Sequence, residues 1–249
     1  MTSFQDPKFC KSILDIAQAY GPYSFWTSNL VLGANPDATW RAVMVVAALK
    51  DPLFAEPCRS LLKATDSRVR AWACTALSEL NYRPAFADIL AMIASNSNRV
   101  RRHAREAAAS MQGLPLRTHY VHRVIPGLHI PPLVLISEDD PAIIRFNQRF
   151  IQRMGCQVEI ATSEEKTVEL ALHVFPQVII TDNLKYNDCL SGLNMTWDLC
   201  RRKELRETLF FMLTVDEVEP MFLWGGGDAY FSKPLDLRKF GRIMEDYLL

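Results

Sequence analysis

Apolar positions in the N-terminal half of the chain recur with a period of 31 residues. The stretch 37–42 aligns with 68–73 and again with 99–104. Within each copy, the apolar positions are spaced by three, one and three residues, which places them on one face of a helix. The equivalent positions are Ala42, Ala73 and Ala104; Val45, Ala76 and Ala107; Val46, Leu77 and Ala108; and Leu49, Leu80 and Met111. The pattern predicts three equivalent helices whose small side chains allow close packing.

A shorter apolar segment lies between each pair of these predicted helices. Residues 52–64 and 84–94 both begin with proline, which is tolerated in the first turn of a helix. Asp66 and Ser67, and likewise residues 96–98, precede the next helix and are typical N-cap residues. We therefore expect alternating pairs of helices that bury their faces against their neighbours along the array.

The stretch at 66–77, Asp-Ser-Arg-Val-Arg followed by regularly spaced alanines, resembles a HEAT repeat, and residues 98–108 form a looser second copy. The resemblance covers roughly residues 35–112. It implies an all-α, HEAT-like helical-repeat domain over residues 1–115, with an exposed groove that binds another protein. A plain helical bundle is the alternative interpretation of the same pattern.

From residue 132 the pattern alternates between short apolar runs and helical periods. The apolar runs are 133–137, 157–161, 177–181, 209–213 and 229–232, and the helical segments are 142–154, 164–173, 194–202, 217–224 and 237–248. This alternation predicts an α/β domain over residues 132–249, with a flavodoxin-like, doubly wound, five-stranded parallel sheet. Residues 116–131 contain several prolines and few helix formers, and we interpret them as a linker.

Polar side chains follow the predicted strands at one edge of this sheet. Glu138 and Asp139 follow the first strand, Asp182 ends the third, and Thr214 and Lys233 follow the fourth and fifth. Ligands of such sheets bind beyond the carboxyl ends of the strands. Three carboxylates close together repel one another and need a cation, and hard oxygen ligands suit Mg²⁺ or Mn²⁺. Asp182 can then attack phosphorus, and Lys233 can pair with the phosphoryl oxygens.

In this order, the residues resemble the receiver domain of response regulators in two-component phosphorelay signalling. Glu138 and Asp139 match the acidic pair of that family, and Asp182 matches its phospho-acceptor. The other matches are Thr214 as the switch hydroxyl, Tyr230 as the switch aromatic residue, and Lys233 with Pro234 as the lysine–proline pair. The resemblance covers residues 132–249, nearly half of the chain.

The resemblance also implies ligands and partners. Glu138, Asp139, Asp182 and the backbone carbonyl of Leu184 would hold the metal ion. A histidine kinase or a histidine phosphotransfer protein would donate the phosphoryl group, and the HEAT-like domain would contact an output protein. The chain would modify itself in this way and would not turn over an outside substrate, so we expect no separate enzymatic activity.

Three features depart from the receiver pattern. The loop at 183–192 is two residues longer than usual, lacks the expected proline and places its glycine at Gly192. Val215 replaces the small residue that commonly follows the switch threonine. Three consecutive glycines at 225–227 precede the fifth strand and predict a flexible approach to it. The longer loop leaves a constitutive scaffold with a degenerate receiver as an alternative.

Charge divides the chain into unlike halves. Residues 1–130 hold fifteen Lys and Arg against nine Asp and Glu, and residues 131–249 hold thirteen against nineteen. A basic run lies in the first half, at Arg99, Arg101, Arg102, His103 and Arg105. A phosphate-binding face for nucleic acid is one interpretation of this run, and a solvated or docked repeat face is the alternative that we favour.

Composition adds two expectations. No apolar run reaches the ~20 residues of a membrane helix, and the N-terminus lacks the pattern of a signal peptide, so we expect a cytoplasmic protein without membrane insertion. The six cysteines are scattered, which favours free thiols over disulfides.

Overall fold

The computed structural model describes residues 3–113, 131–182, 185–186 and 189–248. The chain divides into two compact units, Met1–Arg117 and Thr118–Leu249. Apart from Pro131, the linker that we predict at residues 116–131 lies outside the described residues. None of the helices within the described ranges is long and apolar enough to cross a membrane.

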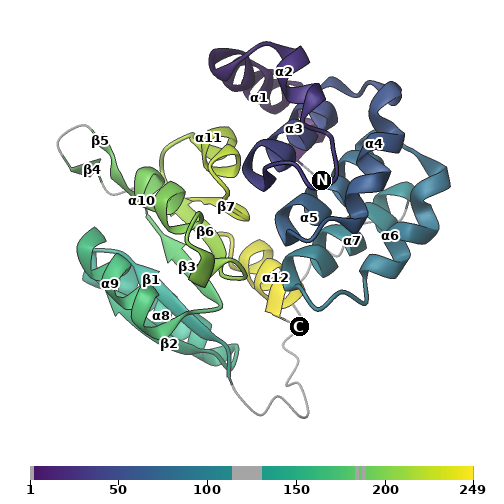
Figure 1. The fold of residues 1–249 in the computed structure, drawn as a ribbon. Coiled ribbons are helices and arrows are strands. Elements are labelled where there is room, and N and C mark those ends of the chain that lie inside the picture. The colour runs from purple at the N-terminus through teal and green to yellow at the C-terminus, as the bar shows by residue number, and fades with distance from the viewer. Residues whose placement is uncertain (1–2, 114–130, 183–184, 187–188, 249) are drawn as a thin grey trace. The chain divides into compact units, whose positions relative to one another are not determined.

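The described part of the N-terminal unit consists of helices and their connections (Figure 1). In order, they are η1 (Ser3–Gln5), α1 (Pro7–Tyr20), α2 (Tyr23–Ser28), α3 (Pro36–Leu49), η2 (Pro52–Phe54), α4 (Ala55–Ser60), η3 (Leu61–Lys63), α5 (Ser67–Glu79), η4 (Arg83–Ala85), α6 (Phe86–Met92) and α7 (Asn98–Met111). Helices α3, α5 and α7 are the three that the 31-residue period predicts. They pack in sequence, α3 on α5 and α5 on α7.

The period extends to the starts of these helices. Helix α3 follows Asn35, α5 follows Asp66 and α7 follows Ser97. The side chains of Asn35 and Asp66 each accept a hydrogen bond from the backbone N–H two residues later, at 2.9 and 2.8 Å, which satisfies an otherwise unpaired donor of the first turn. The aligned alanines of the three helices are fully buried, as the predicted close packing requires.

The partner segments are less regular than the pattern predicts. The segment 52–64 divides into η2, α4 and η3, and the segment 84–94 comprises part of η4, all of α6 and two residues beyond it. Pro52 and Pro57 both lack a backbone N–H, so the first of these segments cannot form an unbroken ladder of helical hydrogen bonds. Short turns of 3₁₀ helix fill the gaps.

The C-terminal unit contains a five-stranded parallel sheet (Figure 1). Its strands are β1 (Leu133–Ser137), β2 (Gln157–Ala161), β3 (Val178–Thr181), β6 (Leu209–Thr214) and β7 (Ala229–Ser232), in the order β2-β1-β3-β6-β7. The connecting helices are α8 (Pro141–Arg153), α9 (Glu164–Val174), α10 (Ser191–Leu199), η5 (Lys203–Leu205) and α11 (Glu219–Trp224), and α12 (Leu237–Leu248) follows the last strand. This order and the parallel pairing are those of the flavodoxin-like fold that the sequence predicts.

Both faces of the sheet are covered. Alternate residues of the central strands, such as Ile136, Ile180 and Phe211, form one core with Ile151 of α8 and Met244 of α12. On the other side, α9 packs against β1 and β2, and α10 packs against α9. Every residue of β3 and β6 is buried, which explains their continuous apolar sequence.

The longer loop after β3 contains a small additional element. Strands β4 (Lys185–Tyr186) and β5 (Cys189–Leu190) pair antiparallel, and α10 begins directly after them. The remaining residues between Asp182 and β5 lie outside the described residues.

Candidate functional site

The carboxyl ends of four parallel strands place the predicted site residues side by side. Ser137 of β1 pairs in register with Thr181 of β3, and Thr214 of β6 with Ser232 of β7. Hydrogen bonds of the ladder continue one residue beyond three of the strands. The backbone N–H groups of Glu138, Asp182 and Lys233 donate to Ala161, Ser137 and Thr214, at 3.1, 3.1 and 2.9 Å. The backbone positions of these three residues are therefore fixed by the sheet.

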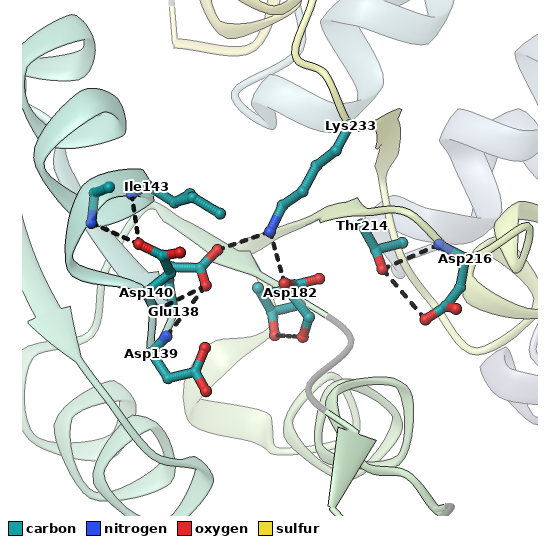
Figure 2. Close-up of polar contacts among 10 residues, drawn as sticks. Glu138, Asp139, Asp140, Ile143, Asp182, Thr214, Asp216 and Lys233 are labelled. Carbon is teal, nitrogen blue, oxygen red and sulfur yellow. Dashed lines mark hydrogen bonds and ion pairs between the residues drawn. The ribbon is translucent and has the colours of Figure 1, made fainter.

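Lys233 joins the two acids that follow β1 and β3. Its ammonium donates to Asp182 Oδ2 at 2.7 Å and to Glu138 Oε2 at 3.0 Å (Figure 2). The side chain of Glu138 is only 4% exposed, while those of Lys233 and Asp182 are 17% and 18% exposed. The site is thus a partly buried group in which one ammonium bonds to two carboxylates.

The three consecutive acids after β1 have different roles. The second oxygen of Glu138 accepts from the backbone N–H groups of Asp139 and Asp140, at 3.2 Å each. Asp140 caps α8, since its Oδ1 accepts from Ala142 N and Ile143 N at 2.6 and 3.3 Å. Asp139 is exposed, and its carboxylate points away from Lys233 (Figure 2).

Burial and pairing oppose each other at this site. Burial raises the pKa of Glu138, and this effect exceeds the opposing effect of the hydrogen bond from Lys233. Burial alone would lower the pKa of Lys233, but its bonds to Asp182 and Glu138 outweigh burial and raise that pKa. The lysine therefore stays charged over the whole physiological pH range.

Thr214 and Tyr230 lie at the same edge but contact a different acid. The hydroxyl of Thr214 donates to Asp216 Oδ2 at 3.4 Å and accepts from Asp216 N at 3.3 Å. The phenol of Tyr230 donates to the backbone carbonyl of Asp216. Burial, followed by the nearby charge of Glu219, raises the pKa of Tyr230. The sequence interpretation missed Asp216, although its position two residues after a strand-end threonine is typical of a local turn.

The predicted metal ligands agree with Mg²⁺ in chemistry but are not assembled around one point. Glu138, Asp139 and Asp182 supply the hard oxygen atoms that this ion prefers, whereas Leu184 lies outside the described residues. Within the described ranges, no group of three or more His, Cys, Asp or Glu side chains is arranged to hold a metal ion. The ammonium of Lys233 lies between Glu138 and Asp182, and Figure 2 draws no contact from it to the Asp139 carboxylate.

Most side chains of the basic run bond to other residues of the N-terminal unit. Arg99 is 1% exposed and donates to Ser67 Oγ at 3.2 Å. Arg101 donates to the carbonyl of Ser95 at 2.8 Å, as Arg70, one period earlier, donates to the carbonyl of Ala64 at 2.7 Å. Arg70 and Arg101 therefore hold the loops before α5 and α7 in place.

The remaining members of the basic run differ in exposure. Arg102 pairs with Glu106 at 3.0 Å. Arg105 is exposed. His103 is buried and shares a hydrogen bond of 2.8 Å with Thr75. Because most members of the run bond within the unit, the geometry favours a structural role over a phosphate-binding face.

Comparison with known families supports the interpretation of the N-terminal unit. The family model described as HEAT repeats matches residues 24–109. This confirms the HEAT resemblance and includes part of α2, which precedes the stretch predicted from the period. No curated protein matches the chain.

Solved structures similar to the C-terminal unit include response regulators and the receiver domain of a histidine kinase. A response regulator from Chloroflexus aurantiacus is 19% identical, with a TM-score of 0.43, and the match covers 48% of this chain and 99% of that chain. The chemotaxis protein CheY4 of Vibrio cholerae is 20% identical, with a TM-score of 0.43 and coverages of 47% and 99%. The receiver domain of a sensor histidine kinase from Pseudomonas aeruginosa, described with a magnesium ion in its active-site cleft, is 19% identical, with a TM-score of 0.43 and coverages of 47% and 97%.

Proposed function

We propose that the C-terminal unit accepts a phosphoryl group on Asp182 from a histidine kinase or a histidine phosphotransfer protein, and that the HEAT-like unit conveys this state to a protein partner. The observation that carries the proposal is the position of Asp182. Asp182 directly follows β3, a central strand of a doubly wound sheet, and its carboxylate is partly open to solvent and bonded at 2.7 Å to Lys233, which directly follows β7. A nucleophile at this edge is accessible to a protein donor.

The chemistry at Asp182 is a transfer between two nucleophiles. A carboxylate oxygen of Asp182 bonds to phosphorus, the bond from phosphorus to the donor's imidazole nitrogen breaks, and the imidazole takes up a proton from solvent. Lys233 lies where it can pair with the transferred oxygens. Thr214 and Tyr230 are the groups that would reorient afterwards.

A divalent ion would be held by Asp139, Asp182, Glu138 and the carbonyl of Leu184. When bound, such an ion neutralises the charge that accumulates on carboxylate and phosphoryl oxygens. For the acids to gather, Lys233 must release Glu138 Oε2 and Asp139 must turn toward Asp182. The first movement involves a side chain alone, because the sheet fixes the backbone of Lys233 and Glu138.

A polar cavity supports the proposed protein partner of the N-terminal unit. It has a volume of about 330 Å³ and lies between α4, η3 and α6. Across it, Arg59 pairs with Asp88 at 2.6 Å, so the cavity spans two successive helical pairs. Affinity capture with the full chain tests this step. We expect Arg59→Ala to weaken retention of the partner, and Lys11→Ala, which alters an exposed residue of α1, to leave it unchanged.

The constitutive scaffold remains a second candidate because one observation favours it. Lys233 already donates hydrogen bonds to both Glu138 and Asp182, in the place where a metal ion would bind. In this case partner binding would not depend on the charge state of Asp182, and Asp182→Asn would retain every partner that the wild type binds.

Labelling with acetyl phosphate and Mg²⁺ tests the leading proposal. We expect a base-labile phosphoryl group on the full chain and its loss in Asp182→Asn. Asp198→Asn is the matched control, because Asp198 is exposed on α10. Peptide mapping that places no phosphoryl group on Asp182, or equal labelling of all three proteins, would contradict the proposal.

A further inference from the structure

Thr214 and Tyr230 come from different strands but bond to the same residue. Thr214 ends β6, Tyr230 lies within β7, and both contact Asp216 in the loop between β6 and α11. The two contacts use different parts of that residue. The carboxylate of Asp216 accepts from Thr214, and its backbone carbonyl accepts from Tyr230. A substitution of the Asp216 side chain therefore changes the first contact and leaves the acceptor of the second in place.

The bond to Asp216 directs the hydroxyl of Thr214 away from the phosphoryl-accepting site. In Figure 2, Thr214 points toward Asp216, and Asp182 with Lys233 lies on its other side. A hydroxyl carries one proton and can donate only one full hydrogen bond. While Thr214 donates to Asp216 Oδ2, the same proton cannot reach an oxygen on Asp182. The long distance of 3.4 Å describes a weak bond that a stronger acceptor can replace.

We infer that the Asp216 carboxylate is a positioning residue that competes with a phosphoryl group on Asp182 for the hydroxyl of Thr214, and so sets how readily the site responds; this inference rests on the proposed function. To bond to the hydroxyl of Thr214, the phosphoryl group must replace the Asp216 carboxylate as its acceptor. Removing that carboxylate lowers the cost of moving Thr214 and leaves Asp182, Lys233 and the backbone acceptor of Tyr230 unchanged.

Titration with beryllofluoride and Mg²⁺ tests this inference on the full chain, with tryptophan fluorescence as the readout. We expect Asp216→Ala to lower the half-saturating concentration by about five-fold, the size of one ordinary hydrogen bond, since the bond that is removed is long. Asp216→Asn keeps an acceptor oxygen and is expected to stay within about two-fold of the wild type. Glu217→Ala removes an exposed neighbouring charge and serves as the control for a general electrostatic effect.

Repeating the Asp216→Ala substitution in the Thr214→Val variant distinguishes an effect of the hydrogen bond from a purely structural role of Asp216. In Thr214→Val the hydroxyl is absent, so Asp216→Ala is expected to have no further effect. Equal half-saturation of Asp216→Ala and the wild type overturns the inference. An equal gain in Asp216→Ala and Asp216→Asn overturns it as well, because charge alone then accounts for the change. If the wild type and Asp182→Asn both fail to respond, the proposed function fails and the inference fails with it.

Discussion

The ammonium of Lys233 lies 2.7 Å from Asp182 Oδ2, although the two residues are 51 positions apart in the chain. The same nitrogen lies 3.0 Å from Glu138 Oε2. The lysine bonds to both acids, so it contributes to the stability of the unit as well as to its chemistry. Two carboxylates at one sheet edge would otherwise repel each other in a partly buried site.

Removing this cation should destabilise the C-terminal unit. We expect Lys233→Met to lower its stability by about 1–3 kcal/mol, because Glu138 is left buried without its charged partner. Hydrogen exchange of peptides from β3 and β6 measures the effect in the full chain. Lys203→Met is the control, since Lys203 is exposed in η5. Unchanged protection of β3 and β6 in Lys233→Met would show that the ion pairs add nothing to stability.

Glu138 should make the stability of this unit depend on pH in the acidic to neutral range. Burial raises its pKa in the folded state above the ordinary value near 4.5. The folded state then binds more protons than the unfolded state between these two values, so stability falls as pH rises. The contribution is fully present below the ordinary pKa and is lost as pH rises through the folded pKa.

The measurement is hydrogen exchange of β3 and β6 at a series of pH values, corrected for intrinsic exchange. We expect Glu138→Gln to flatten the decline in stability that begins near the ordinary pKa of 4.5 and ends above the raised pKa of the folded state. Glu159→Gln, on the edge strand β2, provides the comparison. A decline of the same slope in Glu138→Gln and the wild type would assign the pH dependence to other groups.

Two of the three glycines at 225–227 are close-packing positions, which corrects the flexible approach that their sequence predicts. A Cβ atom on Gly225 would lie 1.5 Å from Trp197 Nε1, and one on Gly227 would lie 2.2 Å from Phe222 Cε1. In addition, Cys200 Sγ donates to the carbonyl of Gly225 at 2.9 Å. Helix α10 therefore packs tightly against the end of α11.

Gly225→Ala should accordingly destabilise the C-terminal unit. We expect a loss of about 1–3 kcal/mol, because the indole of Trp197 must move to admit a methyl group. Trp197→Leu in the same chain is expected to recover part of the loss by opening space. Chemical unfolding followed by circular dichroism measures both. Additive effects of the two substitutions would argue against the contact as the cause.

The sequence predicts the backbone of both units better than it predicts the contacts of the site. A strict period places Ala42, Ala73 and Ala104 in equivalent buried positions, because each repeat must present the same face to its neighbour. Likewise, alternating patterns place Asp182 and Lys233 at one edge, because parallel strands all end there. Periodicity does not predict which acidic side chain accepts a hydrogen bond from which donor. The bond from Thr214 to Asp216 and the outward turn of Asp139 depend on rotamers, which only the assembled loops determine.

The residue that caps the C-terminus of α9 has a backbone conformation that is unfavourable for its side chain. Phe175 has φ of 49° in the left-handed region, where glycine is preferred, and its side chain is 50% exposed. We expect Phe175→Gly to stabilise the C-terminal unit by about 0.5–1 kcal/mol through relief of this strain. Phe175→Ala keeps the Cβ atom and should not show the gain. Urea unfolding of the three proteins measures the difference, and an equal gain in both variants would point to the exposed ring as its source.

Arg101 distinguishes the structural interpretation of the basic run from the nucleic-acid interpretation. Its bond to the Ser95 carbonyl repeats the bond from Arg70 to Ala64 one period earlier. We expect Arg101→Ala to destabilise the N-terminal unit by about 1–2 kcal/mol, because that carbonyl loses its donor. Arg105→Ala is the matched control. Arg105 is exposed one turn later on α7, and its loss should cost less than about 0.5 kcal/mol.

The same two variants test nucleic-acid binding. If the run serves the fold, the wild type should show no retention on DNA that falls steeply with salt, and neither substitution should change its elution. Retention at low salt that both Arg101→Ala and Arg105→Ala reduce would restore the phosphate-binding face, because each lost phosphate contact lowers the salt dependence of binding. Stability and retention together therefore separate the two roles, since only a structural arginine changes unfolding without changing elution.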